Sequence, residues 1–174
     1  MSPAAHGVAP ADAPSRTARV IVASTRGAAG ETLDTTGPAI RSWLAERGFE
    51  TPPPRVVADG APVGAALAEA LERSVDLILT TGGTGVSPSD RTPEMVEPLL
   101  DVTIPGLVEE LRRRGAQALP SAVLTRGVAG FAGRTFIMTL PGSPGGVRDG
   151  LAVLEPLLEH LLAQRSGAPR GQHD

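Results

Sequence analysis

The residues best suited to chemistry are a glycine-rich segment and two aspartates. The segment Gly82–Gly85 contains three glycines in four residues, and Asp90 follows it closely. Main-chain N–H groups in such a loop can bind anions, and each hydrogen bond to a charged oxygen contributes roughly 1.5–3 kcal/mol. The second aspartate, Asp59, ends an earlier apolar run. This combination predicts a phosphate site with carboxylates at its rim.

Two carboxylates beside a phosphate require a cation. A carboxylate about 4 Å from a phosphate costs on the order of 4 kcal/mol at an effective dielectric constant near 20. A Mg²⁺ ion between Asp59, Asp90 and the phosphate removes this conflict, because magnesium prefers one or two carboxylates together with phosphate oxygens. We therefore expect a nucleotide or polyphosphate site with Mg²⁺, suited to phosphoryl or nucleotidyl transfer. The alternative is a binding module that holds a phosphorylated ligand without turnover.

Each feature also has a simpler interpretation. The central glycines could form a tight strand-to-helix connection and nothing more. Asp59 could cap a helix that begins at Pro62. A second glycine-bearing loop, Thr25–Gly30, could be a plain connection, although Arg26 is well placed in it to bind an anion. The local sequence leaves the last two alternatives open.

The residue types that are absent exclude several mechanisms. The chain has no cysteine, and all 16 of its basic residues are arginines. This excludes thiolate catalysis, a Walker-type lysine and Schiff-base chemistry, and only His160 could serve a catalytic triad or histidine metal site. The net charge of −3 gives no broad basic surface for nucleic acid. Because no stretch resembles a membrane span or a secretory signal, we expect a cytoplasmic protein.

The segments on either side of the central loop predict how it is positioned. Val75–Leu79 is a short apolar run typical of a buried strand in a parallel sheet. After the loop, Thr92 is a suitable N-cap, Pro93 suits the first helical position and Glu94 lies in the first turn. The order strand, glycine loop, helix places amides and a positive helix end at the carboxyl edge of a strand, where open α/β sheets bind anions.

Further strands and helices alternate along the chain. We expect strands at Arg19–Ser24, Val56–Val57 and Thr135–Leu140, the last paired with Ala122–Thr125 and Gly127–Phe131. Helices should begin near Asp34, Pro62 and Pro105, and a long one should run from Val147 to Leu161 with a kink at Pro156. The alternation predicts an α/β fold with one right-handed, mostly parallel sheet and helices on both faces.

This topology brings the candidate residues to one edge of the sheet. Loops that follow parallel strands face one another there, so we expect the glycine-rich turns to build a single pocket. The pocket would gather Ser24–Arg26, Asp59, Gly82–Asp90 and Gly142–Ser143. We expect one domain over residues 18–166, between a disordered N-terminal tail at residues 1–17 and a C-terminal tail at residues 167–174.

The same residues resemble those of a known family. Thr80–Gly85, followed by Asp90-x-Thr92-Pro93-Glu94, is similar to the MoaB/Mog family of molybdenum-cofactor biosynthesis. The likeness continues in Ala23-Ser24-x-Arg26, Gly30, Asp34-x-x-Gly37-Pro38, Asp59, Pro105-Gly106-x-x-Glu109-x-x-Arg112 and Leu140–Pro144. In order and spacing these segments cover about residues 19–165.

The resemblance implies a fold, an assembly and an activity. The fold is a three-layer αβα sandwich whose sheet is mostly parallel with one antiparallel strand, and the assembly is a homotrimer. The ligand is molybdopterin, a pterin that carries a dithiolene and a terminal phosphate. Active members use Mg-ATP to adenylylate that phosphate and release pyrophosphate, so ATP is a co-substrate and Mg²⁺ a cofactor. Other molybdenum-cofactor biosynthesis proteins would be its partners.

Carried over residue by residue, the resemblance also assigns roles. Asp59 and Asp90 match the two catalytic carboxylates and would organise Mg²⁺ and the triphosphate. The nucleotide and its phosphates would be held by Gly82, Gly83, Thr84, Gly85, Pro141, Gly142 and Ser143. The substrate would contact Ser24, Arg26, Asp34, Thr125 and Arg126. Glu109 and Arg112 would form a pair that positions their helix.

Two rival assignments share much of this pattern. The CinA-type domain has the same fold, but its loop resembles GGLGPT followed by Asp-Asp, and this chain has GGTG with Asp-Arg-Thr-Pro-Glu. Within the family, some relatives bind the pterin and show no adenylylation. The presence of both Asp59 and Asp90 favours an enzyme over such a carrier.

Overall fold

The structure is a computed structural model that describes residues 15–166. The strands are β1 (Arg16–Ala23), β2 (Phe49–Glu50), β3 (Arg55–Val57), β4 (Leu77–Thr81), β5 (Val102–Thr103), β6 (Ala129–Ala132) and β7 (Thr135–Leu140). The α-helices are α1 (Thr25–Ala28), α2 (Thr36–Glu46), α3 (Ala61–Glu72), α4 (Thr92–Val96), α5 (Pro105–Ala116), α6 (Pro144–Leu154) and α7 (Leu158–Ser166). Two 3₁₀ helices complete the set: η1 (Glu97–Leu99) and η2 (Pro120–Leu124).

All strands belong to one 7-stranded sheet with the order β2-β1-β4-β7-β6-β5, in which β3 also pairs with β1. The central strands β1, β4 and β7 run parallel, so that Val20 lies opposite Leu79, and Leu79 opposite Met138. β6 runs antiparallel to both of its neighbours, β5 and β7. The predicted sheet, mostly parallel with one reversed strand, is confirmed. β3 lies at an edge, as the prolines before it indicate.

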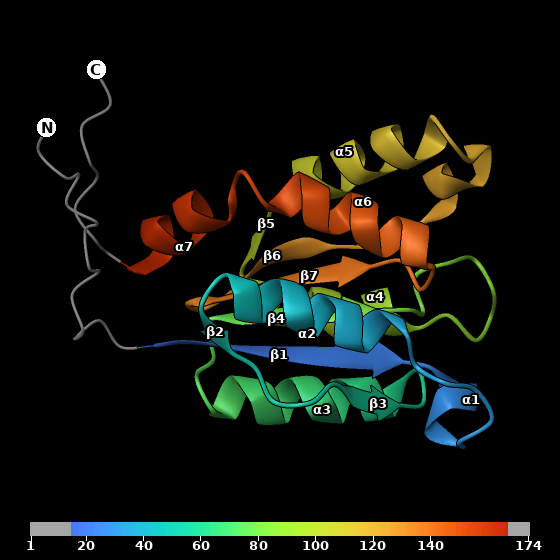
Figure 1. The fold of residues 1–174 in the computed structure, drawn as a ribbon, viewed down its shortest axis with the longest axis horizontal. Helices are drawn as coiled ribbons and strands as arrows, with labels where there is room; N and C mark the ends of the chain where they lie inside the picture. The colour runs from blue at the N-terminus through green and yellow to red at the C-terminus, as the bar shows by residue number, and fades with distance from the viewer. Residues whose placement is uncertain (1–14, 167–174) are drawn as a thin grey trace, which may run out of the picture.

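Helices cover both faces of the sheet and give the predicted three layers (Figure 1). Leu79 and Met138 face the core beneath α2, α5 and α6, and their neighbours Ile78 and Ile137 face the core beneath α3 and α4. Successive side chains of a strand point to opposite faces. Both faces are buried here, which explains why apolar residues on the central strands occur at consecutive positions and do not alternate with polar ones.

The carboxyl ends of the three central strands carry the candidate site. The arrowheads of β1 and β7 both point to the right in Figure 1, and the connections that follow the central strands gather on that side. A main-chain bond from Gly82 N to Leu140 O, 3.1 Å long, ties the turn after β4 to the end of β7. Two segments far apart in the sequence therefore meet at this edge.

Several local expectations need correction. The predicted loop Thr25–Gly30 begins with α1, because the side chain of Ser24 accepts a hydrogen bond from Gly27 N at 3.0 Å and caps a helical turn. Residues 122–124 lie in η2 and do not pair with β7. Pro156 separates α6 from α7 and does not merely kink one helix, because proline has no N–H group for the helical ladder.

The predicted tails can be compared only in part with the structure. β1 already begins at Arg16, inside the segment that we expected to be an N-terminal tail. Residues 1–14 and 167–174, which include His6 and His173, lie outside the described residues. Within residues 15–166, every helix is too short or too polar to traverse a lipid bilayer.

Candidate functional site

The turn after β4 depends on two glycines with positive φ angles. Gly82 has φ +89° and Gly83 has φ +66°, a backbone conformation that side chains with a Cβ rarely adopt. A Cβ on Gly82 would also collide with the carbonyl oxygen of Ala23, and one on Gly83 would collide with the carboxylate of Asp59. Only glycine therefore allows the chain to leave β4 this close to β1 and to Asp59.

The glycine-rich turns leave main-chain donors without partners. Within the described residues, no hydrogen bond involves the N–H groups of Gly83, Thr84, Gly85, Gly142 and Ser143. The last two precede α6, whose first turn is capped by Ser143 Oγ accepting from Gly146 N at 3.1 Å. Free amides beside a helix N-terminus form a site for an anion.

These donors line the larger of two cavities at this edge, which has a volume of about 470 Å³. That size suits a nucleotide or another small ligand. One wall is formed by the turns after β4 and β7. The opposite wall is apolar and comes from α5, η2 and the turn between them, with Leu111, Leu119, Ala122 and Leu124. Its carboxylates are Asp90 and Asp149. The cavity thus combines anion donors, an apolar wall and two acidic groups.

A smaller cavity of about 250 Å³ lies on the β1 side of the same turns. It is lined by Ser24, Asp34, Thr81 and Gly82, among others, and Gly142 lines both cavities. The two turns touch at the boundary, where a Cβ on Gly142 would lie 3.2 Å from Gly82 Cα. The single pocket that we expected is therefore two adjoining cavities, because the close approach of these turns divides the space.

Asp90 lies at the larger cavity with one carboxylate oxygen unpaired among the described residues. It is partly buried and lines the larger cavity. Its Oδ2 accepts a hydrogen bond from Ser87 N at 3.1 Å, and Oδ1 has no partner among the described residues. One oxygen thus anchors the side chain, and the other is free to accept a ligand.

The carboxylate of Asp59 already accepts hydrogen bonds from other residues of the protein. Its Oδ1 accepts from Gly60 N at 2.7 Å and from Thr92 Oγ1 at 3.0 Å, and its Oδ2 accepts from Arg91 N at 3.0 Å. Asp59 lines neither of the two cavities. Thr92 is not the predicted N-cap of α4, because Arg91 takes that position and the Thr92 hydroxyl turns to Asp59 instead.

The carboxylates at this edge meet part of what a magnesium ion requires. Within residues 15–166, no group of three or more His, Asp and Glu side chains could hold a metal ion by itself. Magnesium does not need such a group, since it often binds through one or two carboxylates and phosphate oxygens. Asp90 Oδ1 fits this requirement directly. Asp59 could contribute only the remaining lone pair of Oδ2, because its other positions accept protein hydrogen bonds.

Thr125 and Arg126 lie against the central loop. Thr125 lines the larger cavity, and its Oγ1 donates to Thr84 Oγ1 at 3.0 Å. The Arg126 guanidinium donates to the carbonyl oxygens of Gly85 at 2.7 Å and Asp90 at 2.8 Å. It therefore binds the loop, although the sequence suggested that it binds the substrate.

Arg126 also forms an ion pair with Glu94 at the start of α4. The hydrogen bond from Arg126 lowers the pKa of Glu94, and the same bond raises the pKa of Arg126. Both side chains stay more than one-third exposed, at 37% and 40%, so solvent screens the pair. Asp90 and Asp59 act on Arg126 in the same direction, which places this cation within the field of three carboxylates.

The other residues that were predicted to bind the substrate do not all lie at the site. Ser24 and Asp34 line the smaller cavity, and Asp34 Oδ1 also caps α2 by accepting from Gly37 N at 2.9 Å. Arg26 lines neither cavity and is 74% exposed, with Glu31 as a loose partner at 3.7 Å. The structure thus does not bring Arg26 to the site.

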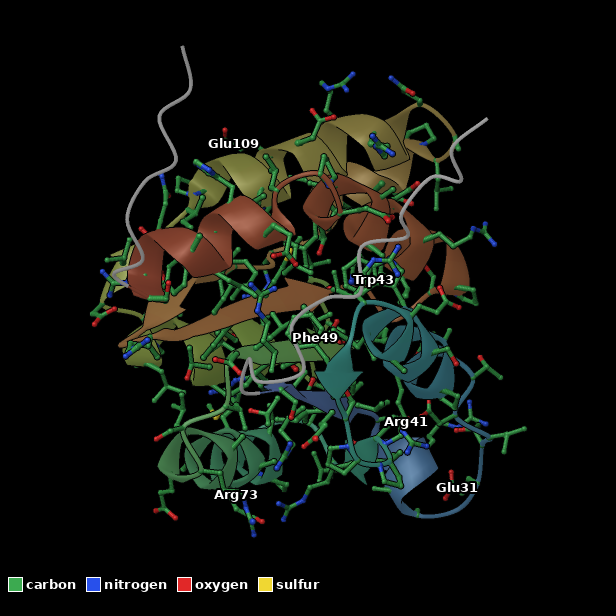
Figure 2. The ribbon with its side chains drawn as sticks, turned by 60° about the vertical axis from the view of Figure 1, so that its left-hand side comes forward. Glu31, Arg41, Trp43, Phe49, Arg73 and Glu109 are labelled. Atoms are coloured by element: carbon green, nitrogen blue, oxygen red, sulfur yellow. The ribbon has the colours of Figure 1, made fainter. Side chains whose placement is uncertain are left out.

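The expected pair of Glu109 and Arg112 does not form. Glu109 lies on the outer, exposed face of α5 (Figure 2). Arg112 Nε instead donates to the carbonyl oxygen of Thr125 at 2.8 Å. Arg112 therefore ties α5 to the segment that packs against the central loop.

Sequence reasoning missed Asp149 on α6. Its partly buried carboxylate lines the larger cavity and has no hydrogen bond or ion pair among the described residues. Helical spacing could have revealed it, because Asp149 follows Gly145 and Gly146 at i+4 and i+3 and so shares their helix face. Since both glycines line the cavity as well, that whole face of α6 turns toward it.

Comparisons with known proteins identify the family of this chain. Residues 19–160 match the family model described as "Probable molybdopterin binding domain". The molybdenum cofactor biosynthesis bifunctional protein of Synechococcus elongatus is 40% identical over 155 residues, which are 88% of this chain and 49% of that protein. The molybdopterin adenylyltransferase of Pyrococcus furiosus is 35% identical over 148 residues, which are 82% of this chain and 87% of that protein.

A solved structure has a similar fold. The molybdopterin biosynthesis Mog protein from Mycobacterium ulcerans superimposes with a TM-score of 0.81 and 54% identity, covering 86% of this chain and 98% of that one. The chain spans half or less of the length of several curated relatives that it matches, such as the Synechococcus protein at 49%.

Proposed function

The chain belongs to the MoaB/Mog family of molybdopterin-binding domains, which act in molybdenum-cofactor biosynthesis, and from this premise we propose that it is a molybdopterin adenylyltransferase. In this proposal it binds molybdopterin and ATP and transfers AMP to the terminal phosphate of the pterin. One observation carries the proposal: free amides from two turns and a free Asp90 oxygen line the same cavity. A relative of 35% identity carries the same name, which supports it.

The reaction fits the residues that the chain has. An oxygen of the pterin phosphate attacks the α-phosphorus of ATP, a new P–O bond forms, and the α–β phosphoanhydride bond breaks to release pyrophosphate. The attacking phosphate is already ionised at neutral pH, so no general base is needed. A site without lysine, cysteine or a buried histidine can therefore support this reaction by positioning and charge neutralisation.

Each part of the larger cavity has a role in this proposal. The free amides of Thr84, Gly85 and Ser143 bind phosphate oxygens and stabilise the charge that develops on them. Asp90 Oδ1 would hold Mg²⁺, which supplies charge neutralisation at the triphosphate when bound. Asp59 supports the start of α4, next to Asp90, and offers the metal at most one lone pair.

A second candidate function is a carrier that binds molybdopterin without turnover. The observation that favours it is the occupancy of Asp59, whose carboxylate already accepts three protein hydrogen bonds. A carrier would keep such bonds for stability and would have no need of a second metal ligand. The enzyme is preferred because the free oxygen of Asp90 would have no evident purpose in a carrier.

A single-turnover assay with molybdopterin, ATP and Mg²⁺ tests the proposal, with AMP transfer and pyrophosphate release as readouts. The expected result is transfer that requires Mg²⁺ and is lost in Asp90→Asn. No transfer by the unaltered protein, with the pterin still tightly bound, would identify a carrier and overturn the enzyme.

The remaining properties implied by the family belong to the same proposal. They are a homotrimeric assembly, a cytoplasmic location, one functional domain over residues 18–166 and contacts with other molybdenum-cofactor proteins. Light scattering coupled to gel filtration tests the assembly directly. A monomer or dimer at micromolar concentration would remove the trimer from the proposal and leave the chemistry of the site unaffected.

A further inference from the structure

The segment that follows η2 lies against Thr84, the residue just before the loop of residues 85–90. Arg126 N donates to the carbonyl oxygen of Thr84 at 2.7 Å, and Thr125 Oγ1 donates to the Thr84 hydroxyl at 3.0 Å. Thr84 is only 4% exposed, so these bonds are shielded from water. The residue that leads into the loop is thus fixed to residues 125 and 126.

The Arg126 side chain then reaches along the loop. Its Nε donates to Gly85 O at 2.7 Å and its Nη2 to Asp90 O at 2.8 Å. Its Nη1 bonds to the carboxylate of Glu94, in the first turn of α4. One planar guanidinium therefore joins the start of the loop, its end and the helix that follows.

The loop has few other restraints. Its internal bonds join Asp90 to Ser87 N and Ser87 O, and Ser87 to Ser89. Among the described residues, Arg126 is the only one outside residues 85–90 that makes a hydrogen bond to them. Val86 in the same loop is 66% exposed, so apolar packing adds little there. Asp59 holds the residue that follows the loop, Arg91, and Arg126 is the residue that holds Asp90 and the loop itself.

We propose that Arg126 is a positioning residue, which holds the loop of residues 85–90 so that the carboxylate of Asp90 lines the larger cavity. Its guanidinium acts through two carbonyl oxygens and does not bind the substrate. This proposal deepens the function above and rests on it for its effect on catalysis. Lysine cannot replace Arg126, because a single ammonium group cannot reproduce the planar set of donors that spans the acceptors.

Hydrogen–deuterium exchange tests the positioning without any ligand. In Arg126→Ala and Arg126→Lys, exchange of the hydrogen-bonded amides of Ser87, Asp90, Arg91 and Thr92 should become at least about tenfold faster, because charged hydrogen bonds that close the loop are lost. Peptides from α2, which covers the opposite face of the sheet from α4, should exchange as in the unaltered protein and show that the fold is intact. Unchanged exchange in the loop of both variants would overturn the proposal.

The kinetics of AMP transfer provide a second readout. For Arg126→Lys we expect kcat to fall by about 10²-fold, as for other displaced catalytic groups, with the KM for ATP within about threefold. Guanidinium ions at millimolar concentration should restore part of the activity of Arg126→Ala. A raised KM with unchanged kcat would instead make Arg126 a substrate ligand.

Glu94→Gln is the matched control. It removes the charged partner of Arg126 and retains both carbonyl bonds, so kcat should stay within about threefold if those bonds position Asp90. If the unaltered protein shows no AMP transfer, the proposed function fails. The exchange experiment still decides the positioning of the loop, so the two failures can be told apart.

Discussion

Thr92 Oγ1 donates a hydrogen bond of 3.0 Å to Asp59 Oδ1, joining the start of α4 to the segment after β3. Thr92 is fully buried, at 0% exposure. The bond therefore has little competition from water, and Arg91 N adds a second link to the same carboxylate. Asp59 thus has a structural function other than the helix cap that the sequence suggested, because Gly60 is the N-cap of α3.

This relationship predicts the effect of Thr92→Val. The substitution keeps the shape of the side chain and removes its hydroxyl donor, so the free energy of unfolding should fall by about 1–2 kcal/mol. Urea unfolding measures the change, with Thr92→Ser as the control because serine retains the hydroxyl. Equal stability of the valine variant and the unaltered protein would show that the bond contributes nothing.

Asp90→Asn should separate chemistry from stability. The amide oxygen of asparagine can still accept from Ser87 N, so the melting temperature should stay close to that of the unaltered protein. The negative charge that Mg²⁺ requires is lost, and AMP transfer should fall by at least about 10²-fold, with molybdopterin affinity within a few-fold. Loss of pterin binding in a folded variant would instead place Asp90 in contact with the pterin.

Asp149→Asn tests the residue on α6 that the sequence did not reveal. Its unpaired carboxylate can accept two neighbouring N–H or O–H donors, such as the guanidine-like edge of a pterin or the two hydroxyls of a ribose. We expect the affinity for the ligand that supplies these donors, either molybdopterin or ATP, to fall about tenfold or more. Titration calorimetry with ATP, 2′-deoxy-ATP and molybdopterin would measure which of them it is. Glu109→Gln, on the outer face of α5, serves as the control and should change nothing.

Gly142→Ala tests the boundary between the two cavities. The new Cβ would lie 3.2 Å from Gly82 Cα and must push two turns apart by a few tenths of an ångström. We expect a loss of roughly 1 kcal/mol in stability, together with lower activity, because the free amides of both turns move. Gly106→Ala is the control, since nothing lies within 4 Å of its added Cβ. An active and equally stable Gly142→Ala would mean that the turns have room to adjust.

The Arg126–Glu94 pair predicts a response to acid. The hydrogen bond from Arg126 lowers the pKa of Glu94 from its ordinary value of 4.5. The contribution of the pair is therefore present above pH 4.5 and is lost as the pH falls through the lowered pKa. Urea unfolding at pH 7 and near pH 3.5 should show a larger acid loss for the unaltered protein than for Glu94→Gln. Identical pH dependence of the two proteins would remove this pair as a cause.

The sequence by itself determined the central strands, the glycine turns and the family. Val75–Leu79 and Thr135–Leu140 are short runs composed mainly of apolar residues, which are typical of strands buried on both faces. The glycines at 82 and 83 mark positive φ angles that other residues avoid. These are local signals, because they depend on the period of side chains and on the conformations allowed to single residues.

The tertiary structure alone decided which groups meet. It joined Asp59 to Thr92, placed Arg126 on the loop of Asp90 and moved Arg26 away from the site. It also divided one expected pocket into two, because Gly82 and Gly142 come into contact. Such contacts join segments far apart in the chain. They depend on the register of β4 against β7 and on the packing of helices, which no local pattern encodes.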